Sequence, residues 1–238
     1  MRSLLLTFAA LFSVGAIVGG GAWLLYGSDL VRLEQVRVVG NARASEASVR
    51  HLADLAVGEP LVAQDLARAV HGVERHPWVR RASARRVFPD TVVLQVEERE
   101  IAALLLTDGL FLVDHEGVPF RRATPGDLDH PVITGLPASL VAEHPAVARR
   151  VVSEALAWMT AVDAHPSLDV RDLSEVRFER ATGYALVFRN GGEILVGFRS
   201  PSDALGRLDL LLSNGVELSA RPARVDLAQG SLAVVTLL

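Results

Sequence analysis

Residues 76–99 read HPWVRRASARRVFPDTVVLQVEER and contain two strand patterns joined by a turn. His76-Pro77-Trp78 ends a preceding helix and starts a strand that runs through Val87. Phe88-Pro89-Asp90-Thr91 is rich in turn-forming residues, and Val92 to Glu98 then alternates apolar and polar side chains. The stretch therefore predicts an antiparallel β-hairpin with one half-buried face.

The residues before this hairpin predict one more strand and two helices. Alternation from Leu33 to Val39 predicts the strand, which Gly40-Asn41 closes as a turn. Ser45 is a typical helix N-cap, and helical spacing of apolar side chains continues to about Ala56. A second helical pattern runs from about Ala63 to Glu74. This order predicts a compact α+β module with two helices on one face of a small sheet.

The residues after Glu100 predict a second, mixed β domain with two helices. The helices are expected from Ala146 to about Ala164 and from Ser200 to Asn214, the second with proline at its first position. Residues 123–145 contain four of the eleven prolines and are expected to be mostly loop. Strands are expected within residues 102–120 and at residues 176–178, 184–189, 193–196, 223–227 and 231–237.

The first twenty-eight residues carry one charged side chain, Arg2, and residues 4–26 carry none. A helix of that length rises roughly 34 Å, enough to cross a hydrocarbon core about 30 Å thick. We therefore predict a transmembrane helix over residues 4–26 behind a very short tail, residues 1–3. The alternative is a cleavable signal peptide, but its apolar region would be shorter, and Trp23 and Tyr26 suit the membrane–water boundary. The charges flanking this segment leave its orientation open.

Composition excludes several classes of function. Without residues 1–26 the chain has 23 arginines and 28 acidic residues, a net charge of −5, which disfavours nucleic acid as a partner. Cysteine is absent, so the chain has no disulfide, no thiol nucleophile and no zinc–thiolate site.

No sequence pattern demands catalysis or a bound metal. Four of the seven histidines precede proline, and none pairs with another at the spacing of helical metal ligands. Asp114-His115-Glu116 could bind a cation, but three polar residues before Gly117 are also typical of a solvated turn. The chain has no nucleophile elbow and no phosphate-binding glycine loop outside the apolar run. These observations predict a protein that is not an enzyme and needs no cofactor.

The predicted hairpin carries clustered charge. Its first strand holds four arginines, Arg80, Arg81, Arg85 and Arg86. If the turn is tight, Arg81 lies opposite Glu98, and such a cross-strand ion pair contributes roughly 0.2–1 kcal/mol. The other arginines could contact anionic lipid headgroups or an acidic partner, or they could form a solvated sheet face.

The chain ends in a strand pattern with no charge, proline or glycine. It consists of Ser231, Leu232, Ala233, Val234, Val235, Thr236 and Leu237. Natural edge strands are guarded by lysine, proline or a bulge, because their free N–H and C=O groups pair with other chains. Either this strand is central in its sheet, or a second protein covers it by strand addition. In the second case Leu232, Val234 and Thr236 would provide selectivity.

Several short motifs in both regions point to one protein family. The first region contains Val36-Arg-Val-Val-Gly-Asn41, His76-Pro-Trp-Val79, Arg86-Val-Phe-Pro-Asp-Thr91 and Val96-Glu-Glu-Arg99. The second contains Leu112-Val-Asp-x-x-Gly117 and, more loosely, Asn190-Gly191, Arg207-Leu208 and Val225-Asp226-Leu227. Together these motifs resemble the bacterial cell-division family FtsQ/DivIB over nearly the whole chain, most specifically at residues 76–99.

This resemblance implies a POTRA domain at residues 32–101 and a β domain at residues 102–238. Both would lie on the outer side of the cytoplasmic (inner) membrane at the division septum, in a non-enzymatic single-pass scaffold that links division proteins. In the family, the C-terminal strand pairs with the small protein FtsB, which travels with FtsL, and by position that contact falls on residues 231–237. The POTRA domain is linked to recruitment of other division proteins, so its exposed face is a second candidate contact. The family usually has a cytoplasmic tail, and only residues 1–3 precede the apolar run here.

Two other functions are compatible with parts of the sequence. A POTRA-bearing export factor would continue into a long series of barrel strands, for which this chain has no room. A membrane-anchored envelope hydrolase would need a convergent nucleophile or metal site.

Overall fold

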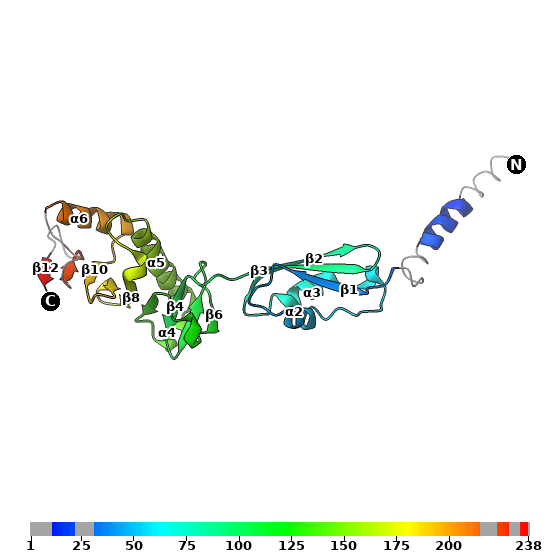
Figure 1. Cartoon of the computed structure of the whole chain (residues 1–238), viewed down its shortest axis with the longest axis horizontal. Coiled ribbons are helices and arrows are strands. Elements are labelled where there is room, and N and C mark those ends of the chain that lie inside the picture. The colour runs from blue at the N-terminus through cyan, green and yellow to red at the C-terminus, as the bar shows by residue number, and fades with distance from the viewer. Residues whose placement is uncertain (1–10, 22–30, 215–222, 229–233, 238) are drawn as a thin grey trace. The chain divides into compact units, whose positions relative to one another are not determined.

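The computed structural model describes residues 11–21, 31–214, 223–228 and 234–237. The chain forms two compact units, residues 1–99 and residues 100–238 (Figure 1). Residues 11–21 are helical, while residues 4–10 and 22–26 of the predicted apolar helix lie outside the described residues. Within the described ranges, no helix combines the length and apolarity needed to cross a membrane.

The first unit has the predicted order of strand, helix, helix, strand, strand. Its elements are β1 (Gln35–Val39), α2 (Glu46–Ala53), the 3-10 turn η2 (Leu61–Ala63), α3 (Leu66–Val73), β2 (Val79–Val87) and β3 (Thr91–Glu98). The sheet order is β1-β3-β2, with β1 parallel and β2 antiparallel to the central β3. Both helices lie on one side of this sheet (Figure 1). The fully buried side chains between the two layers include Leu33, Val49, Leu61 and Leu94.

Side-chain caps determine where the two helices of this unit begin. The Ser45 side chain accepts the N–H of Ser48 at the start of α2, as predicted, and Asp65 accepts the N–H of Arg68 at the start of α3. Both helices are shorter than expected. α2 ends where Asp54 adopts a left-handed conformation (φ 47°), and Asp65 sets the start of α3 after the separate turn η2.

The second unit contains a single mixed sheet of nine strands in the order β12-β11-β10-β9-β8-β7-β4-β5-β6. The strands are β4 (Ala103–Leu106), β5 (Leu110–Val113), β6 (Pro119–Arg122), β7 (Val132–Thr134), β8 (Leu173–Glu179), β9 (Gly183–Phe188), β10 (Glu193–Gly197), β11 (Ala223–Asp226) and β12 (Val234–Leu237). The helices are α4 (Ala138–Glu143), α5 (Pro145–Asp163) and α6 (Pro201–Ser213), with 3-10 turns η3 (Pro125–Asp127) and η4 (Val170–Asp172). Helices α5 and α6 cover one face of the sheet and bury Trp158, Val162 and Leu208 against it (Figure 1).

The expectation of mostly loop over residues 123–145 is wrong, because this stretch contains β7 and a third helix, α4. β7 runs parallel to both β4 and β8 and so joins the two halves of the sheet. Its residues Val132, Ile133 and Thr134 are all β-branched, and Ile133 is fully buried. The flanking prolines conceal a strand of only three residues, which is too short to show an alternating pattern.

Replacing Ile133 with alanine is expected to lower the free energy of unfolding by about 2–5 kcal/mol, because it leaves a cavity where the two halves of the sheet meet. Urea unfolding followed by circular dichroism would measure this loss. Val132→Ala, on the same strand but only half-buried, should cost clearly less. Equal losses for the two variants would show that β7 does not join the halves through its buried side chain.

Candidate partner-binding edge and arginine face

The predicted C-terminal strand lies at the edge of the nine-stranded sheet. β12 pairs with β11 in antiparallel register, with Val235 opposite Val225. Since the strand order begins with β12, the described residues provide no neighbour on its other side. A central position is therefore wrong for the part of the strand that the structure describes. The predicted contact residues Ser231, Leu232 and Ala233 lie outside the described residues.

The side chains of β12 divide between the core and solvent. Val235 packs, partly buried, against the core cluster, and its partner Val225 is fully buried. Val234 is 60% exposed, and Thr236 is exposed on the same face. One face therefore fixes the strand to the core, while the other offers an apolar and a hydroxyl side chain to solvent.

Two arginines secure β11, the strand that supports this edge. The Leu227 carbonyl oxygen, just after β11, accepts hydrogen bonds from Nε of Arg199 and Nη1 of Arg207, each at 2.9 Å. The Leu227 N–H donates to the Leu195 carbonyl oxygen at 2.8 Å. The Arg207-Leu208 and Val225-Asp226-Leu227 motifs thus meet in space, a contact that sequence reasoning did not reveal. A short strand bonded at its end in this way gives β12 a fixed support.

A ladder of charges crosses the outer face of the sheet beside this edge. Glu193 on β10 lies 3.3 Å from Arg177 on β8 and 3.6 Å from Arg224 on β11. Burial alone would lower the pKa of Arg177, but its hydrogen bond to Glu175 and the neighbouring carboxylates outweigh burial and raise that pKa. Arg224 lies directly opposite Thr236 of β12. Positive charge therefore reaches the strand next to the edge.

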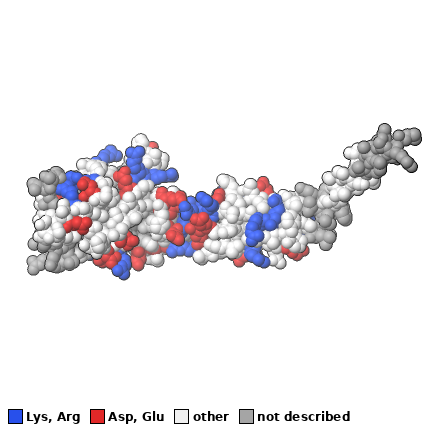
Figure 2. All heavy atoms as spheres, turned by 90° about the horizontal axis from the view of Figure 1, so that it is seen from above, with Lys and Arg blue, Asp and Glu red and all other residues white. Residues whose placement is uncertain are grey.

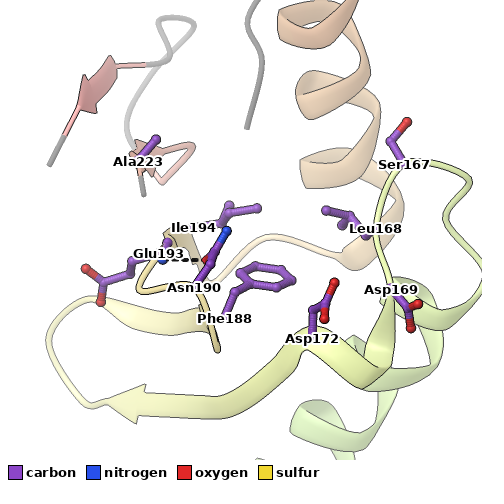
Figure 3. A pocket seen from close by; sticks show the side chains of 10 residues that line it. Ser167, Leu168, Asp169, Asp172, Phe188, Asn190, Glu193, Ile194 and Ala223 are labelled. Carbon is purple, nitrogen blue, oxygen red and sulfur yellow. Dashed lines mark hydrogen bonds between the residues drawn. The ribbon is translucent and has the colours of Figure 1, made fainter. Parts of the chain in front are cut away.

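A pocket of about 320 Å³ lies between η4, the β9–β10 turn and β11 (Figure 3). Its lining consists of Ser167, Leu168, Asp169, Asp172, Phe188, Asn190, Gly192, Glu193, Ile194 and Ala223. The Asn190 side-chain oxygen accepts the N–H of Gly192 at 2.8 Å, which shapes one wall. The described lining contains no histidine, and the described part of the chain contains no group of three His, Asp or Glu placed to hold a metal ion.

The Asp114-His115-Glu116 turn has a structural explanation. Asp114 is 3% exposed, and its Oδ1 accepts the N–H groups of Glu116 and Val118 at 3.0 and 2.9 Å. His115 instead faces Glu100, with Nε2 3.8 Å from Oε2. The buried carboxylate thus closes the β5–β6 turn.

The four arginines predicted on the hairpin do not act as one group. Arg80 forms an ion pair with Glu97 at 2.8 Å. Arg86 donates to the carbonyl oxygens of Leu61, Val62 and Gln64, and so holds η2 against β2. Arg81 and Arg85 are exposed, and neither has an ion pair with another described residue. Of these four arginines, Arg81 and Arg85 are therefore the better candidates for an external contact.

The predicted ion pair between Arg81 and Glu98 is wrong. An irregularity in register between Val79 and Arg81 places Arg81 opposite Glu97 and Val79 opposite Glu98. The ion pair with Glu97 is formed by the neighbouring Arg80 and not by Arg81. The sequence does not reveal this shift, because the turn residues fix the register only at the other end of the hairpin.

Glu98 instead binds the loop between β1 and α2. Its carboxylate accepts the backbone N–H groups of Ala42, Arg43 and Ala44 at 2.7–3.0 Å. Burial tends to raise the pKa of Glu98, but these hydrogen bonds and the charge of Arg43 outweigh it and lower the pKa below its usual value. The acidic motif at the end of β3 is therefore an anchor for a loop far away in sequence.

The neighbouring motifs converge on the same loop. The Arg43 guanidinium lies 4.5 Å from the centre of the Trp78 ring, a cation–π contact. Gly40 has φ +86°, and a Cβ there would lie 2.2 Å from the Val96 carbonyl oxygen, so only glycine fits. The Gly-Asn, His-Pro-Trp and Val-Glu-Glu motifs thus form one junction at one end of the first unit.

Glu98→Gln is expected to lower the free energy of unfolding by about 1–3 kcal/mol, because an amide accepts the three N–H groups less well than a carboxylate. Because the folded-state pKa is lowered, this stabilisation is fully present above the unfolded-state pKa and is lost as pH falls through the folded value. Urea unfolding between neutral and acidic pH should therefore show wild type and variant converging in acid. Glu97→Gln, which removes only an exposed ion pair, is the matched control. A gap that persists unchanged in acid would contradict this assignment.

Comparison with known proteins agrees with both units. Residues 31–99 match the POTRA domain of FtsQ type, and residues 103–228 match the C-terminal domain of cell division protein FtsQ/DivIB. These are two folded modules, a POTRA domain and a mixed β domain, in the order that the motifs predicted. β12 follows the last matched residue.

Curated relatives extend over most of the chain. Cell division protein FtsQ of Myxococcus fulvus is 36% identical over 212 residues, covering 87% of this chain and 73% of the relative. FtsQ of an Anaeromyxobacter species is 34% identical over 217 residues, covering 89% and 74%, respectively. FtsQ of Syntrophotalea carbinolica is 30% identical over 222 residues, covering 91% and 78%. The chain belongs to the FtsQ/DivIB family of cell division proteins, and the resemblance inferred from the motifs is confirmed.

Proposed function

We propose that this protein is a non-enzymatic scaffold of the bacterial division machinery that binds a partner chain by backbone pairing along β12. The observation that carries the proposal is the position of β12, which pairs only with β11 among the described residues. An added strand would satisfy the N–H and C=O groups that point away from β11. Neither lysine nor proline guards this edge.

The side chains around the edge favour a partner strand that carries both apolar and acidic residues. The partner's side chain beside Val235 would extend the core, and the side chain beside Val234 would cover a valine that is now 60% exposed. Beside Thr236, an acidic side chain would come near Arg224. β12 has no acidic residue of its own, so self-pairing would leave Arg224 without this neighbour.

The partner that fits this proposal is an FtsB-like small bitopic protein, together with an FtsL-like protein. The family's pairing between its C-terminal strand and FtsB supports this choice. Residues 4–26 would anchor the chain in the inner membrane with a single pass and hold both units on the extracytoplasmic side at the septum. Their lack of charge over 23 positions supports the anchor.

The POTRA unit would provide a second contact, with other division proteins or with membrane lipid. Arg81 and Arg85 are its best candidates, because Arg80 and Arg86 already have partners within the unit. The contact would be electrostatic and would weaken as salt increases.

Val234→Pro is expected to weaken capture of the FtsB-like partner by about tenfold or more, because proline removes a ladder donor and its ring disturbs an edge strand. Val234→Thr keeps the backbone N–H and the branched shape, and should retain most of the binding. Pull-down with the full chain in detergent would measure capture, and circular dichroism would verify that both variants are folded. Unchanged capture by folded Val234→Pro protein would reject strand addition at β12.

A further inference from the structure

The entry end of the POTRA unit is built from two turns that hold the first residues of the unit between them. On one side, Gly58 N–H donates to the Leu33 carbonyl oxygen at 2.7 Å, and Leu33 N–H donates to the Glu59 carbonyl oxygen at 2.9 Å. On the other side, Glu34 N–H donates to the Asp90 carbonyl oxygen of the β2–β3 turn at 2.8 Å. The chain therefore enters this unit between the loop after α2 and the turn of the hairpin.

Both turns expose apolar side chains at this end. Val57 is 64% exposed on the loop after α2, and Phe88 is 57% exposed on the hairpin turn. Val87, next to Phe88, is 36% exposed. Single exposed apolar residues are ordinary on protein surfaces. Here, however, they occupy the two turns that flank the point of entry.

A row of positive charge crosses the face of the sheet that α2 and α3 leave uncovered, close to this entry end. Arg37 on β1 and Arg85 on β2 both lie opposite Val93 of β3, which is only 6% exposed although it is on the open face. Figure 2 shows a band of basic side chains crossing this unit. Neither Arg37 nor Arg85 has an ion pair with another described residue. The row lies two residues along the strands from Thr91, about 7 Å from the end of the sheet.

We propose that this entry end (Val57, Val87 and Phe88, with Arg37 and Arg85 behind them) rests on the surface of an anionic bilayer. Phe88 and Val57 would enter the interface between headgroups and acyl chains, and the two guanidinium groups would contact lipid phosphates. The inference rests on the anchor in the proposed function, because residues 4–26 would hold this end close to the membrane.

Two observations favour lipid over a protein strand as the occupant. Only four residues separate Tyr26 from Val31, the first described residue of the unit, and they reach at most about 18 Å. The entry end is thus kept at a high effective concentration near the membrane surface. In addition, the backbone groups of Leu33 and Glu34 are already paired with the two flanking turns, so an incoming strand would find few free partners there.

The absence of cysteine allows a direct test with single labels. The full chain, with Val57→Cys or Phe88→Cys carrying an environment-sensitive fluorophore, is reconstituted in nanodiscs of equal parts phosphatidylglycerol and phosphatidylcholine. Lipids with a quencher near the headgroup report contact with the interface, and lipids with a quencher on the acyl chain report insertion of position 17 in the bilayer core. Ala42→Cys, exposed at the opposite end of the same unit, is the control for a solvent-facing site, and Ile17→Cys is the control for the anchor.

Labels at positions 57 and 88 should be quenched and shift their emission to shorter wavelength, while the label at position 42 should do neither. Arg37→Glu together with Arg85→Glu should abolish the shift, and so should discs of phosphatidylcholine alone. Arg68→Glu with Arg75→Glu changes the net charge equally on other surfaces of the unit and should preserve the shift.

Two outcomes would separate failure of this inference from failure of the proposed anchor. If position 17 is quenched but positions 57 and 88 are not, the surface contact is wrong and the anchor stands. If position 17 is not quenched either, the anchor fails and this inference fails with it. A response at positions 57 and 88 that needs an added division protein would assign the surface to a protein partner and overturn the contact with lipid.

Discussion

The unsatisfied backbone of a sheet edge is the constraint on which this structure depends. Each strand in the middle of the nine-stranded sheet has a neighbouring strand on both sides, but the described residues of β12 have one neighbour only, β11. Water can satisfy such an edge, yet an uncharged strand with an exposed valine is an efficient template for another strand. For the scaffold role proposed above such an edge would be useful, because backbone pairing can join two chains without a deep pocket.

The rest of the second unit supports this edge. Arg199 and Arg207 converge on the Leu227 carbonyl oxygen and fix the end of β11, while Val235 ties β12 to the core. In the interior of the sheet, β7 joins the hairpin of β4 and β5 to β8, so that one continuous layer packs against α5 and α6. In the first unit, Glu98 and Trp78 have a comparable structural role at the β1–α2 loop. The conspicuous charged motifs thus mostly stabilise the folds of the two units.

The sequence predicted what depends on local chemistry and missed what depends on contacts between distant residues. The hairpin of residues 76–99, the cap at Ser45 and the last strand follow from turn formers, capping oxygens and alternating side chains, all of which act within a few residues. β7 was missed because its three residues form a strand by pairing with β4 and β8, while their own sequence is too short to show a strand pattern. The Arg81–Glu98 pair failed because a one-residue irregularity moves each side chain to a new neighbour. In the sequence, nothing beyond two weak motifs indicated that Arg207 supports β11.

Hydrogen–deuterium exchange of β12 tests the central claim most directly. If the edge is open in the free protein, amides of residues 234–237 that point away from β11 should exchange quickly. They should become strongly protected when the FtsB-like partner is added, while the amides of β11 should change little. If the β12 amides are already slow to exchange without a partner, or remain fast in a complex that has formed, the edge of this sheet is not where the partner binds.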